Sequence, residues 1–132
     1  MQVKSKDRVK NHGEVFTNER EVKAMLDLLQ PMTIEMTFLE PTCGNGNFVI
    51  EILRRKFDLC KKKKDYITAL NSVFAIDILQ DNIVECKQRV KELYLSYGQK
   101  ENIDFILDTQ IFQGNSLAIM ELLTKKGVQL CL

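Results

Sequence analysis

Apolar residues along the chain follow two patterns, a helical spacing of three and four residues and short continuous runs. The helical spacing predicts helices over roughly 19–29, 46–59, 80–97 and 116–123. The short runs predict strands over 36–39, 72–76 and 111–112, and the alternation of Val128, Leu130 and Leu132 indicates the beginning of another. Helices and strands therefore alternate, which predicts an α/β domain with a parallel sheet and right-handed crossovers.

The segments around these elements divide the chain. Residues 1–12 are polar and basic without periodicity, so we expect a flexible arm before a domain that covers 13–132. Thr17 or Asn18 can cap the first helix, and Pro31 follows it as a stop signal. Lys61–Lys64 interrupts the apolar pattern and is predicted to be a solvated loop or the frayed end of a helix.

Composition narrows the class of protein. The chain has 132 residues, a formal net charge of +1 and 45% hydrophobic residues, which is typical of one soluble globular domain. No apolar run approaches the roughly 20 residues of a membrane span, and the N-terminal residues lack a signal-peptide pattern. The four cysteines are widely spaced, without Cys-x-x-Cys, and His12 is the only histidine. We therefore expect reduced thiols, no zinc site, no membrane partner and a cytoplasmic protein.

The segment Phe38–Phe48 carries the most specific chemical signal. An apolar run ends at Glu40, a Gly-x-Gly turn follows at Gly44 and Gly46, and then a helical pattern begins. A strand, a tight turn and a helix N-terminus in this order form the ligand site of open α/β sheets. The two glycines permit positive φ angles and the close approach of a ligand to the backbone.

The acid before the turn narrows the ligand. The dinucleotide fingerprint requires a third glycine three residues after the second, where this chain has Val49. A pyrophosphate about 4 Å from Glu40 would be repelled by roughly 4 kcal/mol at an effective dielectric constant of 20, whereas an ammonium group would be attracted. S-adenosylmethionine, with a cationic amino acid end and a nucleoside end, fits this arrangement. The alternative is a turn whose glycines serve geometry alone and whose Glu40 is a surface acid.

Two later positions have both a ligand role and a structural alternative. Asp77 ends the second strand, where a carboxylate can accept hydrogen bonds from both ribose hydroxyls, and Ile78 can cover one face of an adenine. Asn115 follows the third strand, and its side-chain oxygen can accept from an adenine amino group. Either residue can instead cap the helix that follows it.

Four segments together resemble the adenine-specific DNA methyltransferases of restriction–modification systems: Gly13–Asn18, Phe38–Phe48, Phe74–Ile78 and Gln113–Leu117. The first has Asn18 where that family has proline, and the last has Asn115 where aspartate is usual. The resemblance implies an incomplete Rossmann-like methyltransferase fold, with three to four mostly parallel strands, flanking helices and an N-terminal helix. It also implies a set of residues that bind S-adenosylmethionine: Phe16, Thr17, Glu40, Pro41, Thr42, Gly44, Gly46, Asn47, Phe48, Asp77, Ile78, Asn115 and Ser116.

The family's catalytic motif, Asn/Asp-Pro-Pro-aromatic, has no counterpart, because the only prolines are Pro31 and Pro41. We therefore assign no catalytic residue and expect this chain to bind the cofactor without methylating DNA. DNA is the expected partner of the complete enzyme, with weak or no binding by this chain. Two alternatives stay open: a non-catalytic module that binds the cofactor or a partner subunit, and part of an RNA, protein or small-molecule methyltransferase. An unpaired edge on the first strand favours self-association.

Overall fold

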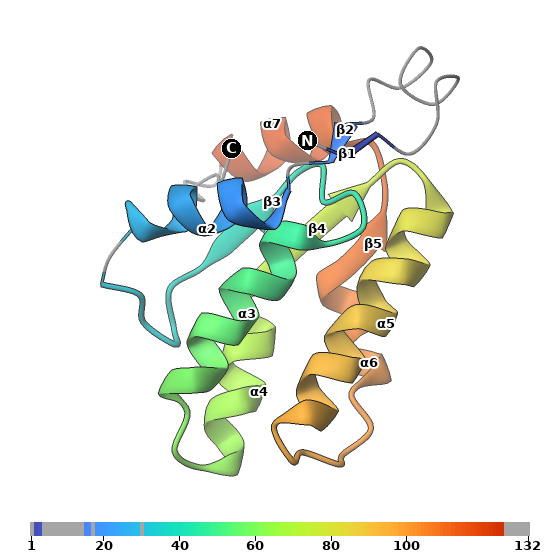
Figure 1. Cartoon of the computed structure of the whole chain (residues 1–132). Helices are drawn as coiled ribbons and strands as arrows, with labels where there is room; N and C mark the ends of the chain where they lie inside the picture. The colour runs from blue at the N-terminus through green and yellow to red at the C-terminus, as the bar shows by residue number, and fades with distance from the viewer. Residues whose placement is uncertain (1, 4–14, 17, 30, 126–132) are drawn as a thin grey trace.

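Three parallel strands form the central sheet of the computed structural model, which describes residues 2–3, 15–16, 18–29 and 31–125. The strands are β3 (Phe38–Glu40), β4 (Val73–Asp77) and β5 (Ile111–Gln113), in the order β3-β4-β5 (Figure 1). Because all three run in the same direction, their carboxyl ends meet at one edge of the sheet. The fold class predicted from the sequence, α/β with parallel strands and flanking helices, is confirmed and is consistent with part of a Rossmann-like fold.

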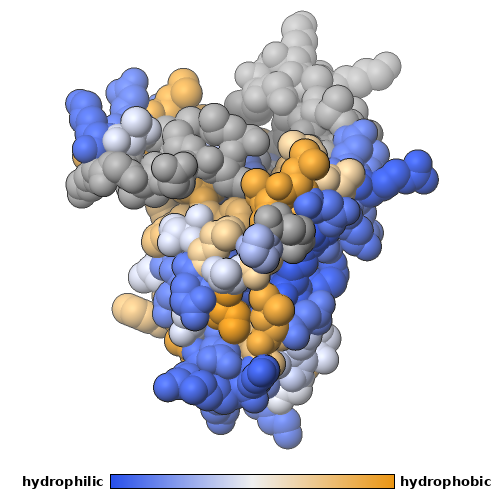
Figure 2. Space-filling model, turned by 90° about the vertical axis from the view of Figure 1, so that its left-hand side faces the viewer, coloured by the Kyte–Doolittle hydropathy of each residue, from blue (hydrophilic) through white to orange (hydrophobic). Residues whose placement is uncertain are grey.

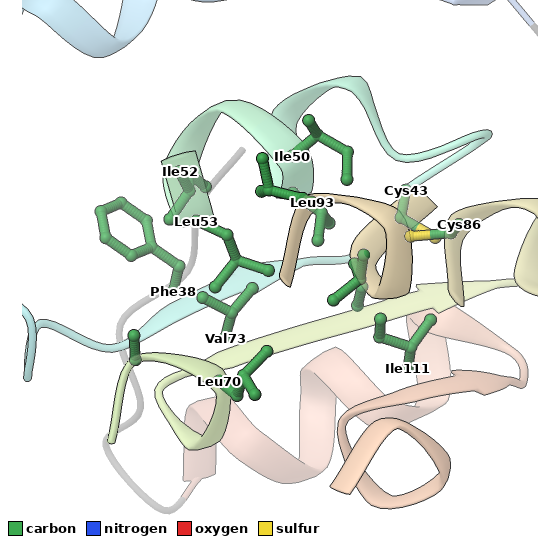
Figure 3. Close-up of a cluster of buried hydrophobic side chains, with 14 of the residues drawn as sticks. Phe38, Cys43, Ile50, Ile52, Leu53, Leu70, Val73, Cys86, Leu93 and Ile111 are labelled. Carbon is green, nitrogen blue, oxygen red and sulfur yellow. The ribbon is translucent and has the colours of Figure 1, made fainter. Parts of the chain in front are cut away.

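Helices cover both faces of this sheet. On one face, α3 (Asn47–Leu59) contacts both α2 (Glu19–Asp27) and α5 (Gln80–Ser96). On the other face, α4 (Lys63–Asn71) contacts α6 (Asp104–Gln110), and α7 (Ser116–Lys125) follows β5. Figure 3 shows this division, with Ile52 and Leu53 of α3 on one side of the strands and Leu70 of α4 on the other. Both faces are therefore buried, as parallel strands require.

The helical spacing located the buried faces well for the two longer helices. In α3 the predicted Phe57 is 1% exposed. In α5 every residue of the predicted face is buried: Ile83, Cys86, Val90, Leu93 and Tyr94. In α2 only half of the predicted face is buried, because Met25 and Leu29 are 45% and 44% exposed. Asn18 caps α2 as predicted, since its side-chain oxygen accepts a hydrogen bond from the Glu21 amide at 3.0 Å.

Two helices were missed by the sequence prediction. The solvated loop predicted over Lys61–Lys64 is confirmed for Lys61 and Lys62 and is wrong for the other two lysines, because α4 begins at Lys63. The Asp65 carboxylate accepts hydrogen bonds from the Lys61 and Lys62 amides and caps this beginning. Helix α6 was missed because it has only seven residues, too few to show a helical period. Asn102 supports it by accepting a hydrogen bond from the Asp104 amide.

The N-terminal region contains an antiparallel pair that the sequence prediction did not include. Strand β1 (Gln2–Val3) pairs with β2 (Val15–Phe16), so part of the predicted arm is in a strand. The rest of that arm, residues 1 and 4–12, lies outside the described residues, as does the strand predicted from Val128 to Leu132. The division into an arm and a domain therefore stays a prediction.

Strand β3 forms an edge of the sheet in the described part of the chain, because it pairs only with β4. Its side chains are nevertheless covered, with Phe38 5%, Leu39 0% and Glu40 8% exposed. On the side of the molecule nearest this edge, apolar residues lie in small areas separated by hydrophilic ones (Figure 2). Self-association through this edge stays a prediction. The side chains of β3 are buried within the chain, so they offer little apolar surface for association.

A fully buried lysine lies at the amino-end edge of the sheet, opposite the edge where the carboxyl ends of the strands meet. Lys56 of α3 donates hydrogen bonds to the Ile34 carbonyl at 3.0 Å, to the Met36 carbonyl and to the Ser72 hydroxyl at 2.6 Å. These partners precede β3 and β4, so one ammonium group holds the amino ends of both strands. Burial lowers the pKa of Lys56 to about 8.

This lysine is expected to make stability depend on pH. Between pH 8 and about 10.5 the unfolded chain keeps a proton that folded Lys56 has lost, so the Lys56 contribution to the free energy of unfolding rises with pH. The melting temperature of wild type should therefore rise relative to that of Lys56→Met as the pH increases from 7.5 to 10. The exposed Lys61→Met is the control, and its difference from wild type should stay constant. A constant difference for Lys56→Met would contradict the lowered pKa.

Candidate cofactor-binding site

The loop between β3 and α3 is a tight turn that depends on its glycines. Gly44 has φ 54° and Gly46 has φ 97°, and no other type of residue has a positive φ in the described part of the chain. Gly46 is also the N-cap of α3 and offers no side chain to cap it. The first backbone N–H groups of α3 therefore lie at the carboxyl edge of the sheet with the positive end of the helix dipole, as the sequence predicted.

Glu40 ends β3 directly before this loop and is buried, not a surface acid. Its side chain is 8% exposed, and Oε1 accepts a hydrogen bond from the Thr42 amide at 3.2 Å. Burial raises the pKa of Glu40 to about 7, the Thr42 hydrogen bonds oppose this change, and the charge of Asp77 adds to it. A partly protonated carboxyl in this place would be stabilised in its ionised form by a cationic ligand.

Asp77 ends β4 and joins the two neighbouring loops. Oδ2 accepts a hydrogen bond from the Gly44 amide at 2.9 Å. Oδ1 accepts from the Leu79 amide at 2.8 Å and from the Asn82 side chain at 3.2 Å. Asp77 therefore organises the glycine loop and the segment that leads into α5, and the helix-cap alternative is wrong, because the N-cap of α5 is Leu79. A carboxylate has about four acceptor positions, so these three bonds leave capacity at Oδ2 for one more donor.

The third loop is tied to the same point. The Gly114 amide donates to the Asp77 carbonyl at 3.0 Å, and the Gln113 side chain donates to the Ile78 carbonyl at 2.9 Å. Asn115 caps α7, because its Oδ1 accepts from the Leu117 and Ala118 amides at 3.1 and 3.4 Å. Its predicted acceptor is therefore used within the chain. Ile78 is 57% exposed, as a residue that covers a flat ligand face would be.

The other residues predicted to bind the cofactor lie in several different parts of the chain. Pro41 is buried, Thr42 is exposed, and Phe48 is partly buried against the core cluster. Phe16 belongs to β2, and Ser116 is the first residue of α7, but their side chains are not described. Thr17 lies outside the described residues. The structure thus brings Glu40, the glycine loop and Asp77 together at one edge, with the Asn115 turn beside them.

Helix α5 contributes residues that the sequence did not mark as part of this site. Arg89 donates hydrogen bonds to the loop, and Cys86 packs against Gly46 so closely that a Cβ there would lie 2.7 Å from its Sγ. Figure 3 shows the sulfur atoms of Cys43 and Cys86 directed toward one another. Both cysteines are free and buried, and the hydrogen bond with Cys86 together with burial raises the pKa of the Cys43 thiol. Periodicity placed Cys86 on the buried face of its helix, but no local pattern reveals a partner about 40 residues away.

The residues present fit a ligand that carries an ammonium group. Asn45 lies between the two glycines, and its Oδ1 is buried without a hydrogen-bond partner, which is costly in a folded protein. Together with the Glu40 carboxylate it offers acceptors for a donor from a ligand. Two hollows of about 240 and 310 Å³ lie elsewhere, between α5 and α6, and share Lys91 and Asp104. Their lining includes no residue of the three loops, and the candidate site is identified by the chemistry of its acids.

Comparison with known proteins gives a partial likeness. Among the described residues, no helix has the length and apolar composition needed to cross a membrane. No protein-family model matches the chain, and no solved structure matches it significantly. Type II methyltransferase M.VspI of Vibrio sp. (strain 343) is 33% identical over 85 residues, which cover 64% of this chain. The aligned part is 18% of that relative's length. The chain therefore has a distant, partial similarity to a type II methyltransferase.

Proposed function

We propose that this domain binds S-adenosylmethionine at the carboxyl edge of its sheet and is the cofactor-binding part of an adenine-specific DNA methyltransferase of a restriction–modification system. The buried Glu40 beside the glycine loop carries the proposal, because its ionised carboxylate repels a phosphate, and a cation next to it would stabilise that ionised form against the burial that raises its pKa to about 7. The four sequence segments and the similarity to a type II methyltransferase support the same assignment.

Each part of the cofactor has a counterpart among the described residues. Glu40 and the Asn45 oxygen accept from the ammonium group, and the N-terminus of α3 receives the carboxylate. The remaining capacity of Asp77 Oδ2 accepts from a ribose hydroxyl, and Ile78 covers the adenine. Bound S-adenosylmethionine supplies an electrophilic methyl group on its sulfonium. The residues of this chain hold the donor, and none is assigned to the acceptor.

Binding without methyl transfer is the second part of the proposal. The sequence has no Asn/Asp-Pro-Pro-aromatic segment to hold the amino group of a flipped adenine. Incubation of the pure chain with adenine-containing DNA and radiolabelled cofactor is the direct check. Incorporation of label into DNA would contradict this part and leave cofactor binding intact.

Affinity for S-adenosylmethionine is expected to increase as the pH rises from 6 to 8. The ammonium binds the ionised form of Glu40, and below pH 7 the ligand must displace a proton, so Kd weakens by up to tenfold per pH unit. Titration calorimetry at pH 6, 7 and 8 measures this trend. Glu40→Gln should bind more weakly and show little change over the same range.

Two comparisons make this experiment decisive. 5′-Methylthioadenosine keeps the nucleoside end but has no amino acid end, so its binding should be nearly independent of pH.

Glu40→Gln should also unfold at a higher temperature than wild type at pH 8, because the raised pKa means that ionised Glu40 destabilises the folded state above pH 7. The absence of binding heat at millimolar S-adenosylmethionine would overturn the proposed function.

A further inference from the structure

Helix α5 holds the glycine loop from two points on one of its faces. Cys86 and Arg89 are three residues apart in this helix, so both side chains lie on the same side. Cys86 contacts the loop at Gly46, where a Cβ would be 2.7 Å from Sγ and 3.3 Å from Cβ of Cys86. Gly46 therefore lacks a side chain because α5 occupies that space, and the loop and α5 fit as one unit.

Arg89 completes this contact with two hydrogen bonds. Its Nη1 donates to the Asn45 carbonyl at 3.0 Å and to the Asn47 side-chain oxygen at 2.8 Å. These acceptors belong to the residues on either side of Gly46 in the sequence. One cationic nitrogen therefore binds both neighbours of the glycine whose φ, 97°, is the larger of the two positive φ angles in the loop. Hydrogen bonds from an ionised donor are roughly twice as strong as neutral ones.

The other basic residues of α5 have different partners. Lys87 forms an ion pair with Asp108 at 2.8 Å, and Lys91 forms one with Asp104 at 2.5 Å, so both turn toward α6. Arg89 is half-buried and turns toward the loop. Its planar guanidinium meets a backbone and a side-chain acceptor at once, which a single ammonium group does with less fixed geometry.

We propose that Arg89 is a positioning residue of the cofactor site, which holds the loop of Asn45, Gly46 and Asn47 in its binding conformation before the ligand arrives. The inference rests on the proposed function for its effect on affinity, and it adds a residue of α5 to a site otherwise built from the strand ends. The loop follows β3 and α5 follows β4, so Arg89 joins the methionine side of the site to the ribose side. If the loop is already ordered before the ligand arrives, binding does not have to supply the free energy for ordering it, so affinity is higher.

Arg89→Gln is the decisive variant, with Arg89→Lys as the conservative one and Lys91→Gln as the matched control on the same helix. We expect Arg89→Gln to weaken S-adenosylmethionine binding at least tenfold in calorimetry and to lower the NMR order parameters of the Asn45, Gly46 and Asn47 amides. Arg89→Lys should recover part of both effects. Lys91→Gln should leave both unchanged, and its melting temperature should differ from that of Arg89→Gln by no more than a few degrees.

The outcomes separate this inference from the proposed function. Wild-type affinity in Arg89→Gln would overturn the positioning role, and so would unchanged loop order parameters. If wild type binds no cofactor, the proposed function fails, and the order parameters alone decide: a loop that becomes mobile only in Arg89→Gln upholds Arg89 as the residue that holds it. A loss of affinity matched by Lys91→Gln would also overturn the inference, because the effect would then belong to the helix as a whole.

Discussion

Asp77→Ala is expected to lower the free energy of unfolding by about 3 kcal/mol or more and to abolish measurable cofactor binding. The substitution leaves the Gly44 and Leu79 amides without their acceptor and removes one acceptor of the Asn82 side chain, at a position that is 8% exposed. Each buried donor left without a partner costs about 1–3 kcal/mol. Chemical denaturation measures the first effect, and calorimetry with S-adenosylmethionine measures the second.

Because Asp77 has a structural role, the alanine variant cannot by itself identify a ribose contact. Asp77→Asn keeps the shape and one acceptor oxygen, so it should cost about 1–2 kcal/mol and stay folded at 25 °C. We expect it still to bind the cofactor at least tenfold more weakly, since the remaining capacity at Oδ2 is lost or replaced by a donor. Wild-type affinity in Asp77→Asn would contradict a contact between Asp77 and the ribose.

Gly46→Ala is expected to destabilise the protein by about 2–5 kcal/mol. A φ of 97° costs an L-residue about 1–2 kcal/mol, and the new Cβ would lie 2.7 Å from Cys86 Sγ, which adds an overpacking cost of about 1–3 kcal/mol. The same change should weaken cofactor binding, because it moves the loop away from α5. Denaturation of the variant with and without S-adenosylmethionine measures both effects.

Gly98→Ala is the matched control for this variant. Gly98 also has a positive φ, of 78°, but no atom of another part of the chain lies within 4 Å of the point where a Cβ would be. It should therefore lose only the backbone part, about 1–2 kcal/mol, and keep its affinity for the cofactor. Equal destabilisation by the two substitutions would show that the contact between Gly46 and Cys86 has no energetic consequence.

The positions of the candidate site residues could be predicted from the sequence where their signal is local. Glu40, Gly44, Gly46 and Asp77 all stand at a change from an apolar run to a turn, and such changes are visible along the sequence. The sequence leaves two roles open for Asp77 and Asn115, because an acid or amide after a strand can bind a ligand or cap a helix. Asn115 caps α7 in the structure, and Asp77 accepts from two backbone amides and a side chain.

The sequence by itself determined the parallel α/β class, the order of the three sheet strands along the chain, the buried faces of α3 and α5, and the acids and glycines that lie at the carboxyl edge of the sheet. Helical and extended periods and turn chemistry are local properties, so they can be read without coordinates. Only the tertiary structure decided the burial of Glu40, the single ammonium of Lys56 that joins two strands, and the contact of α5 with the Gly46 loop through Cys86 and Arg89. These depend on contacts between residues far apart in the chain, and it is the folding of β3, β4 and α5 against each other that brings such residues within bonding distance.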